Sequence, residues 1–391
     1  MTGGPLVSGQ QANAADVTSR KENPADYVVW TDGTNYYGDS MIGTQDFAST
    51  NAATVLQGIF NQMGTSKRAF WVHVKSGDYN MGTVSPAVVF NTTGQSLNQS
   101  PGGFRFTGEG FGKFQQAVGY GSLQATRFLQ GVNNQTLFQG STGKNTLIQS
   151  FNIENMNLNS NGFTGGIGID MSAAEQSGFG SVMRGITFDN TTLGTDSFSK
   201  CIVMDGNEDC SLYNINTNGT LTQGTSTVCD IQWTVQGGNV KIYDSILLTG
   251  TVPNIIKQGQ TFFLGNSTIN GGIKWNGAGN AGIDITEVWG LYMNNGAVPH
   301  FDTNNFTANS VKISGSLLFS STSRVINVGT GFIDTFILEN SYVKGTGAFA
   351  DTAASVGRRR LHARGVKLDS GITALPSGVS SDVNSYWSPD S

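Results

Sequence analysis

Short segments in which apolar residues alternate with other residues recur along the chain, and each of them ends in Asn, Asp or Gly. Eight segments share this pattern, with Thr in place of the first apolar residue in one: Phe151–Asn155, Ile186–Asn190, Cys210–Asn214, Val240–Asp244, Phe262–Asn266, Thr286–Gly290, Val311–Gly315 and Phe336–Asn340. Their final residues lie 35, 24, 30, 22, 24, 25 and 25 residues apart. Alternate side chains of a strand point to opposite faces, so the repeat predicts one short strand in each turn of a solenoid.

The second apolar residue of each segment is predicted to point into the solenoid. These residues are Ile153, Phe188, Leu212, Ile242, Leu264, Val288, Ile313 and Leu338. Stacked one above another, they would form a continuous core in which each coil contacts its neighbours. The pattern therefore predicts an all-β protein, a single-stranded parallel β-helix.

A single helix is predicted over residues 50–63, where apolar residues fall at helical spacing. Ser49 or Thr50 can cap its N-terminus and Gly64 can end it. An open solenoid end exposes core side chains and unpaired strand edges, so we expect this helix to cap the N-terminal end.

The chain divides into four predicted parts. Residues 1–27 lack periodicity and form an extended arm, 28–130 hold the capping segment and first coils, and 131–345 hold the repeats. Residues 346–391 form a C-terminal segment and tail. Its basic cluster, Arg358–Arg360 with Arg364, either binds an acidic partner or a sister subunit, or is the solvated last turn of the solenoid.

Composition narrows the class of function. The 391 residues carry a net charge of -5 with no long basic run, so nucleic acid is not an expected partner. No stretch approaches the roughly 18 apolar residues of a membrane span, and the first thirty residues lack a signal-peptide core. Cys201, Cys210 and Cys229 are predicted to be buried thiols, and we expect no metal and no cofactor.

Outward-facing aromatic residues are the first candidate for function. Tyr213, Tyr243 and Trp289 each precede the final residue of a repeat, so they would form a column along coils stacked roughly 4.8 Å apart. Aromatic rings with a polar end offer rigid surfaces for sugar rings. The column predicts a glycan-binding groove; alternatively, the rings pack under a loop or against another subunit.

Two carboxylates are the second candidate. Glu154 and Asp189 occupy the same column in neighbouring coils of the predicted repeat. Glycoside hydrolysis needs two carboxyl groups about 5–5.5 Å or roughly 6.5–9.5 Å apart, and adjacent coils can supply either spacing. Glu154 and Asp189 are thus candidate catalytic residues, although acidic residues are also ordinary on a solenoid surface.

Histidine chemistry has little support in the sequence. His73, His300 and His362 lie on distant segments, so neither a His-based triad nor a zinc site is expected. His73 alternates with Trp71 and Lys75 along a predicted strand, and we expect it to be structural.

Several motifs near the N-terminus resemble a known family. Asp32-Gly33-Thr34, the helix that begins at Asn51, the strand that ends at Ser76–Tyr79, and Gly108-Glu109-Gly110 followed by Thr126–Leu129 are similar to the first segment of pectate-lyase-like right-handed parallel β-helix proteins, including tailed-virus tailspikes. The resemblance covers residues 28–345 and implies the architecture. It does not imply one activity, because that superfamily includes lyases, hydrolases, epimerases, adhesins and structural spikes. The catalytic signatures of pectate lyases and polygalacturonases are missing from the sequence.

Taken together, the sequence and the resemblance favour a spike or adhesin on a virion or an extracellular surface. We expect it to bind a host-surface polysaccharide or glycoprotein, to form a homotrimer as the resemblance implies, and to attach to a larger assembly through residues 1–27. A polysaccharide-degrading hydrolase or lyase is the first alternative. A purely structural capsid or surface-layer subunit is the second.

Overall fold

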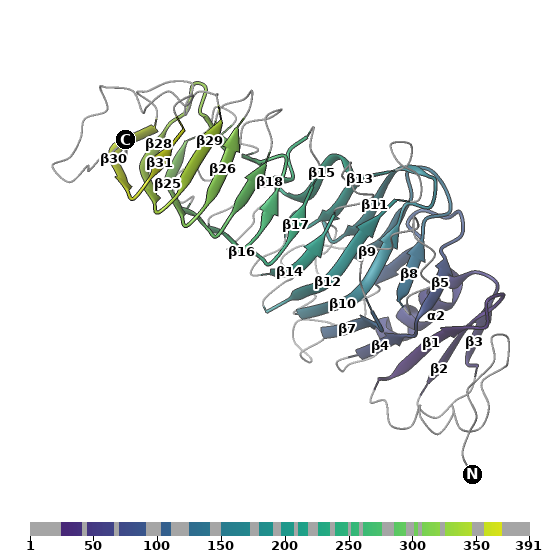
Figure 1. The fold of residues 1–391 in the computed structure, drawn as a ribbon. Helices are drawn as coiled ribbons and strands as arrows, with labels where there is room; N and C mark the ends of the chain where they lie inside the picture. The colour runs from purple at the N-terminus through teal and green to yellow at the C-terminus, as the bar shows by residue number, and fades with distance from the viewer. Residues whose placement is uncertain are drawn as a thin grey trace, which may run out of the picture.

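The protein is an elongated stack of coils with a cap at one end. The computed structural model describes residues 25–40, 45–65, 70–90, 103–110, 125–140, 150–172, 180–190, 197–206, 210–217, 226–234, 239–248, 252–257, 261–275, 285–294, 301–303, 307–320, 325–345 and 356–369. Figure 1 shows the coils following one another from β4 to β31 along a single axis. The predicted arm, apart from residues 25–27, and the tail beyond residue 369 lie outside the described residues.

Each complete coil has three sides, which we call sheet 1, sheet 2 and sheet 3; sheets 1 and 2 are joined through three shared strands. Sheet 1 contains β4 (Phe70–Val74), β7 (Gly103–Gly108), β16 (Asn239–Tyr243), β19 (Thr261–Gly265), β22 (Ile285–Trp289), β25 (Ala308–Ser314), β28 (Ile333–Glu339) and β30 (Val356–Arg364). Sheet 2 contains β5 (Gly77–Asn80), β8 (Thr126–Leu129), β17 (Ile246–Leu247), β20 (Thr268–Ile269), β23 (Tyr292–Asn294), β26 (Leu317–Ser320), β29 (Tyr342–Gly345) and β31 (Lys367–Leu368). Three strands bend so that they belong to both sheets: β10 (Ser150–Asn159), β12 (Val182–Asp189) and β14 (Ser211–Asn216).

Sheet 3 closes the coil on its remaining side. Its members are β6 (Val88–Phe90), β9 (Thr136–Gly140), β11 (Thr164–Asp170), β13 (Ser197–Val203), β15 (Ser226–Trp233), β18 (Ile255–Lys257), β21 (Ile273–Trp275), β24 (Phe301–Asp302) and β27 (Ile326–Asn327). Each strand pairs in parallel with its equivalent in the next coil. The predicted all-β parallel β-helix is therefore confirmed.

The solenoid interior is a continuous apolar stack. All eight residues predicted to point inward are buried, with at most 1% of their surface exposed. Those that belong to sheet 1 lie in register with the inward residue of the next coil, as in Ile242 with Leu264 and Leu264 with Val288. Removal of this much apolar surface from water is the main force that holds successive coils together.

The residue that ends each repeat bends the chain from sheet 1 into sheet 2. It has a left-handed backbone conformation in coil after coil, with φ between 45° and 63° at Asn155, Gly185, Asn214, Asp244, Asn266, Gly290, Gly315, Asn340 and Gly365. Asn, Asp and Gly adopt this conformation at the lowest steric cost. This requirement explains why those three residue types recur at the position.

One repeat was predicted in the wrong register. The bend in that coil is at Gly185 (φ 63°), not at Asn190, so Met183 pairs with Ile153 and Phe188 pairs with Leu158 of sheet 2. Phe188 still faces the core, but from sheet 2. With Gly185 in place of Asn190, the first two spacings become 30 and 29 residues (155 to 185, and 185 to 214), close to the third spacing of 30.

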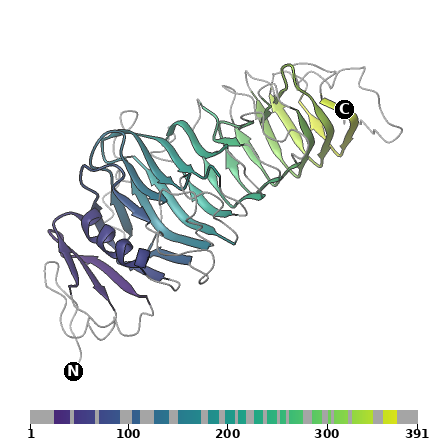
Figure 2. The ribbon, with the colours of Figure 1, turned by 180° about the vertical axis from the view of Figure 1, so that it is seen from behind.

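The N-terminal end of the solenoid is capped as predicted. Helix α2 (Ala52–Thr65) lies across this end (Figure 2), and Phe60 packs edge-on against Phe90 with ring centroids 4.9 Å apart. The N-cap is Asn51, whose Oδ1 accepts the Ala53 N–H at 2.9 Å, rather than Ser49 or Thr50. The antiparallel strands β1 (Tyr27–Thr31), β2 (Tyr36–Ser40) and β3 (Phe47–Ser49) complete the cap, and β1 also pairs in parallel with β4.

The described coils run from β4, within the predicted capping segment and first coils, to the segment that follows residue 345. The first begins at β4, and the last consists of β30 and β31, where Ala363 pairs with Leu338 and Leu368 pairs with Val343. Arg360 and Arg364 of the basic cluster therefore lie on the last described coil.

The three cysteines are free and buried, as predicted. Burial raises the pKa of Cys210, and it raises the pKa of Cys229 to about 12. Separately, the described residues include no helix with the length and apolar character needed to span a membrane.

Candidate functional site

A single row of outward-facing side chains on sheet 1 brings together the candidate residues. We define the outer row as the residues that come directly before the residue with left-handed backbone conformation in each coil. It also includes the residues of β4 and β7 that lie in register with them. From N- to C-terminus it contains His73, Thr107, Glu154, Arg184, Tyr213, Tyr243, Gly265, Trp289, Ser314, Glu339 and Arg364. Neighbours in this row belong to adjacent coils, so the row follows the long axis of the molecule.

The middle of the outer row is a continuous aromatic strip, which we define as Tyr213, Tyr243 and Trp289. The ring centroids of Tyr213 and Tyr243 are 5.3 Å apart, with an interplanar angle of 33°. The ring centroids of Tyr243 and Trp289 are 5.7 Å apart, with an interplanar angle of 47°. All three side chains are partly exposed. The structure thus brings the three predicted residues together on one face.

Gly265 makes the strip continuous, and the sequence analysis missed its role. Trp289 and Tyr243 belong to coils that are separated by the coil of Gly265. A Cβ atom on Gly265 would lie 2.6 Å from Cε2 of Trp289, so the indole lies directly over this residue. Any larger side chain would occupy the space through which the indole reaches Tyr243.

The polar ends of the aromatic strip have no protein partner among the described residues: neither tyrosine hydroxyl nor the indole N–H of Trp289 forms a hydrogen bond. Burial, together with the neighbouring Tyr213, raises the pKa of Tyr243. Its phenol is therefore protonated at neutral pH and can donate a hydrogen bond as well as accept one.

Arg184 lies at the N-terminal end of the strip. Its guanidinium carbon is 5.2 Å from the ring centroid of Tyr213, within the range of a cation–π contact. The side chain is exposed. The predicted repeat register placed Asp189 here, so the sequence analysis did not identify Arg184.

The predicted adjacency of Glu154 and Asp189 is wrong. Glu154 pairs in register with Arg184, whereas Asp189 pairs with Asn159 on the other side of the bend. Asp189 is buried, with 2% of its surface exposed, and its carboxylate accepts the N–H of Asn190. The error follows from the register of that coil, because the bend is at Gly185 and Asp189 therefore falls in sheet 2. The catalytic role of either residue stays a prediction.

Glu154 belongs to another arrangement, the Arg105 triad, which we define as Trp71, Arg105 and Glu154. The Arg105 guanidinium carbon is 4.6 Å from the Trp71 ring centroid, and its Nη2 is 3.1 Å from Oε2 of Glu154. The triad consists of an aromatic ring, a guanidinium and a carboxylate, and it lies on the same face as the aromatic strip.

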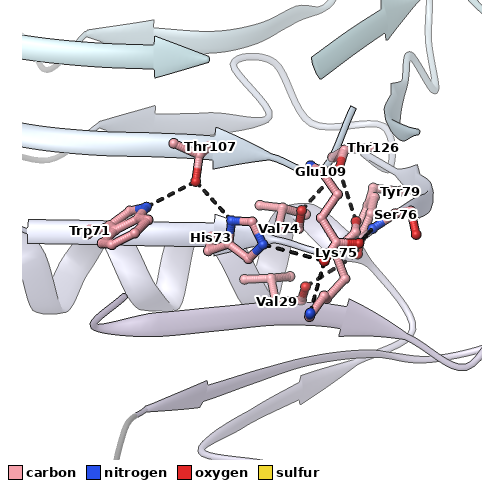
Figure 3. Close-up of polar contacts among 10 residues, drawn as sticks. All are labelled: Val29, Trp71, His73, Val74, Lys75, Ser76, Tyr79, Thr107, Glu109 and Thr126. Atoms are coloured by element: carbon pink, nitrogen blue, oxygen red, sulfur yellow. Dashed lines mark hydrogen bonds and ion pairs between the residues drawn. The ribbon is translucent and has the colours of Figure 1, made fainter. Parts of the chain in front are cut away.

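His73 has a structural role, as predicted. Figure 3 shows it between Thr107 and Glu109 in the first two coils. Its Nδ1 is 2.9 Å from Oγ1 of Thr107 and its Nε2 is 3.5 Å from Oε1 of Glu109. Both ring nitrogens are thus engaged, and the Thr107 hydroxyl also accepts the indole N–H of Trp71 at 3.0 Å.

Glu109 ties the first two coils together. Its carboxylate is 2.9 Å from Nζ of Lys75 and accepts the Ser76 N–H at 2.8 Å. Burial raises its pKa, but the contacts with His73, Lys75 and Ser76 outweigh that effect and lower the pKa from 4.5 to about 2. The carboxylate is therefore ionised at neutral pH and stabilises the turn after β4.

Among the described residues, no group of three or more His, Cys, Asp or Glu side chains is placed to hold a metal ion. Glu208, Asp209 and His300 lie outside the described residues.

The fold is similar to two solved structures. One is the tailspike protein of Acinetobacter phage vB_ApiP_P1, at 12% identity and a TM-score of 0.38, over 87% of this chain. The chain spans 61% of the length of that tailspike. The other is the A-module of the mannuronan C-5 epimerase AlgE6 of Azotobacter vinelandii, at 11% identity and a TM-score of 0.29, over 84% of this chain and 96% of that module. No protein-family model and no curated protein sequence matches the chain.

The parallel register of this chain's own strands carries the assignment of its fold. The predicted resemblance to parallel β-helix proteins is confirmed at the level of the fold.

Proposed function

We propose that the protein is a spike or adhesin of a virion or an extracellular surface, and that its aromatic strip binds a linear host-surface polysaccharide. The observation that carries this proposal is the ring-to-ring contact of Tyr213, Tyr243 and Trp289 along the axis of the solenoid. Consecutive sugar rings of an extended glycan can pack on consecutive aromatic rings, while ring hydroxyls bond to the exposed phenol and indole groups.

The strip suits binding because it is rigid before any ligand arrives. Each ring contacts the next, and the strands beneath them are paired along their length. Little side-chain entropy is then lost when a glycan binds.

The test is binding of purified host-surface polysaccharides to the full chain and to a Tyr243→Ala variant. Tyr243 contacts both of the other rings, so its removal is expected to weaken binding most. Tyr292→Ala is the matched control, because Tyr292 is an exposed aromatic residue (42%) that lies on sheet 2, across the bend at Gly290 from the strip. Equal affinity for the two variants would refute the proposal for this face.

A hydrolase or lyase that works along the same face is the competing proposal. Glu154 is a carboxylate in the outer row and could take part in such chemistry. Chain length and reducing ends, followed during incubation with a bound polysaccharide, separate the two proposals. Shortening that is lost in Glu154→Gln would favour the enzyme, and binding without shortening would favour the adhesin. Failure to bind any surface glycan would favour a purely structural subunit.

We also propose that the spike is a homotrimer that attaches to a larger assembly through residues 1–27. The support is the resemblance to tailspikes and the unpatterned sequence of the arm. Mass measurement in solution, with and without residues 1–27, tests assembly and the arm together. A monomeric full chain would contradict the trimer.

A further inference from the structure

We infer that the ligand of the aromatic strip is an acidic polysaccharide, and that Arg184 binds a carboxylate of the sugar. This inference rests on the proposed function and narrows it to a class of ligand. It comes from a comparison of the two arginines that lie over aromatic rings on the outer surface of sheet 1.

Arg105 and Arg184 have similar aromatic surroundings. The guanidinium carbon of Arg105 is 4.6 Å from the Trp71 ring centroid, and that of Arg184 is 5.2 Å from the Tyr213 ring centroid. In each case the ring lies one coil away from the arginine. Stacking on an aromatic ring holds a guanidinium in place and leaves its N–H groups available for acceptors.

The two arginines differ in their third partner. Arg105 is paired with the Glu154 carboxylate at 3.1 Å, which completes the Arg105 triad. No carboxylate of the described residues forms an ion pair with Arg184, and this arginine is exposed at the end of the strip. Glu154 completes a set of aromatic ring, guanidinium and carboxylate around Arg105. A carboxylate of the ligand would complete the same set around Arg184.

The position of Arg184 also fits a sugar that is stacked on the strip. Arg184, Tyr213 and Tyr243 are consecutive members of the outer row. A sugar ring that packs on Tyr213 therefore has its substituents within one coil of the guanidinium, a spacing of roughly 4.8 Å. Guanidinium and carboxylate form two parallel charge-assisted hydrogen bonds, which select an acid over a neutral hydroxyl group.

Other charges near the strip are mixed, and Glu154, which is paired with Arg105, lies in register beside Arg184. Lys241 lies on the outer side of the same sheet and precedes Tyr243 by two residues, whereas Asp244 is exposed beside that tyrosine. Glu287 pairs in register with Lys312. With a net charge of -5, the chain does not attract polyanions in general. Selection of an acidic glycan would thus depend on Arg184 itself.

The experiment uses the full chain and a panel of acidic bacterial surface polysaccharides, each beside a carboxyl-reduced form of the same polymer. Binding is measured for the unmodified protein, for Arg184→Gln and for Arg364→Gln. Arg364 is an exposed arginine of the same row at the far end of the molecule, so its variant loses the same charge away from the strip.

We expect the unmodified protein to bind acidic forms of the polymers. Carboxyl reduction of a polymer that binds should weaken its binding about tenfold or more. Arg184→Gln should weaken binding of the acidic forms by a similar factor, with little effect on the reduced forms. Arg364→Gln should match the unmodified protein.

If acidic and reduced polymers bind equally, and Arg184→Gln equals Arg364→Gln, the inference is overturned while glycan binding stands. If no polymer binds the unmodified protein, the proposed function and this inference both fail. Circular dichroism of each variant establishes that the fold is unchanged.

Discussion

Two regions of the same sheet face have similar residues and opposite arrangements. In the first coils of sheet 1, Trp71, His73 and Arg105 each contact a protein partner through their polar groups. In the middle coils, the rings of Tyr213, Tyr243 and Trp289 contact one another, but their polar ends face outward without protein partners among the described residues. Aromatic residues on a solenoid surface are therefore not equivalent, and the partners of their polar groups separate a structural region from a candidate binding region.

The largest expected effect comes from the removal of one tryptophan from each region. Trp289→Ala should weaken polysaccharide binding up to about tenfold, since one stacking ring contributes up to about 1.5 kcal/mol, and should change stability little. Trp71→Ala should leave binding unchanged and lower the free energy of unfolding by about 1 kcal/mol or more, because it removes the bond to Thr107 and the contact with Arg105. Calorimetry measures polysaccharide binding of both variants, and unfolding in denaturant measures their stability. The distinction between the two regions fails if both variants lose binding, or if both lose stability, to the same extent.

A smaller effect is expected from Gly265→Ala, which attacks the continuity of the strip. The added methyl would lie 2.6 Å from the indole of Trp289, so the ring must move away from Tyr243. We expect binding to weaken about fivefold, or ~1 kcal/mol. Trp289 fluorescence is obtained as the difference between the emission of a protein with Trp289 and that of the same protein with Trp289→Phe. Iodide should quench this fluorescence more strongly in Gly265→Ala than in the unmodified protein, and the measurement needs no ligand.

Ser314→Ala is the control for Gly265→Ala, because Ser314 occupies the outer row one coil beyond Trp289. Unchanged quenching in Gly265→Ala would show that the indole does not need the space over the glycine.

Much of this arrangement could be predicted from the sequence, because it depends on strict local requirements. The left-handed bend admits Asn, Asp and Gly at low cost, so the turn residue recurs visibly and fixes the direction of each side chain before it. The fold and the placement of Tyr213, Tyr243 and Trp289 follow from that. The N-terminal helix was predicted from its own apolar spacing.

The parts that were missed depend on contacts between coils. Both Gly185 and Asn190 can occupy a left-handed bend; the even spacing favours Gly185, and the pairing of Met183 with Ile153 establishes it. That slip placed Asp189 in the outer row and left out Arg184. Gly265 carries no pattern of its own, because its role is the space that it leaves for a side chain of another coil.

The first region can also be tested through pH. The pKa of Glu109 is lowered in the folded state to about 2, below its ordinary value of 4.5. Its contribution to stability is therefore fully present above pH 4.5 and is lost as the pH falls towards 2. Glu109 is partly exposed, so we expect Glu109→Gln to cost about 1 kcal/mol or less at pH 7.

Unfolding in denaturant at a series of pH values checks this prediction. The difference in free energy of unfolding between Glu109→Gln and the unmodified protein should shrink below pH 4.5. A difference that stays constant down to pH 2 would mean that the carboxylate charge does not stabilise the turn. Polysaccharide binding at pH 7 should not change, since Glu109 belongs to the first region.

The smallest expected effect is the most direct link between the two regions. Glu154→Gln removes the carboxylate that pairs with Arg105 and that lies in register beside Arg184. The Arg105 side chain is 45% exposed and that of Glu154 is 15% exposed, so stability should fall by about 1 kcal/mol. Because two guanidinium groups then face solvent without that carboxylate, an acidic polysaccharide should bind slightly more tightly, by about twofold. A carboxyl-reduced polymer should bind as before.

Binding titrations at low and high salt measure the difference in affinity between Glu154→Gln and the unmodified protein, and high salt should abolish this difference. Weaker binding of the acidic polymer would mean that Glu154 contacts the ligand directly, and the distinction between a closed first region and an open second one would have to be abandoned.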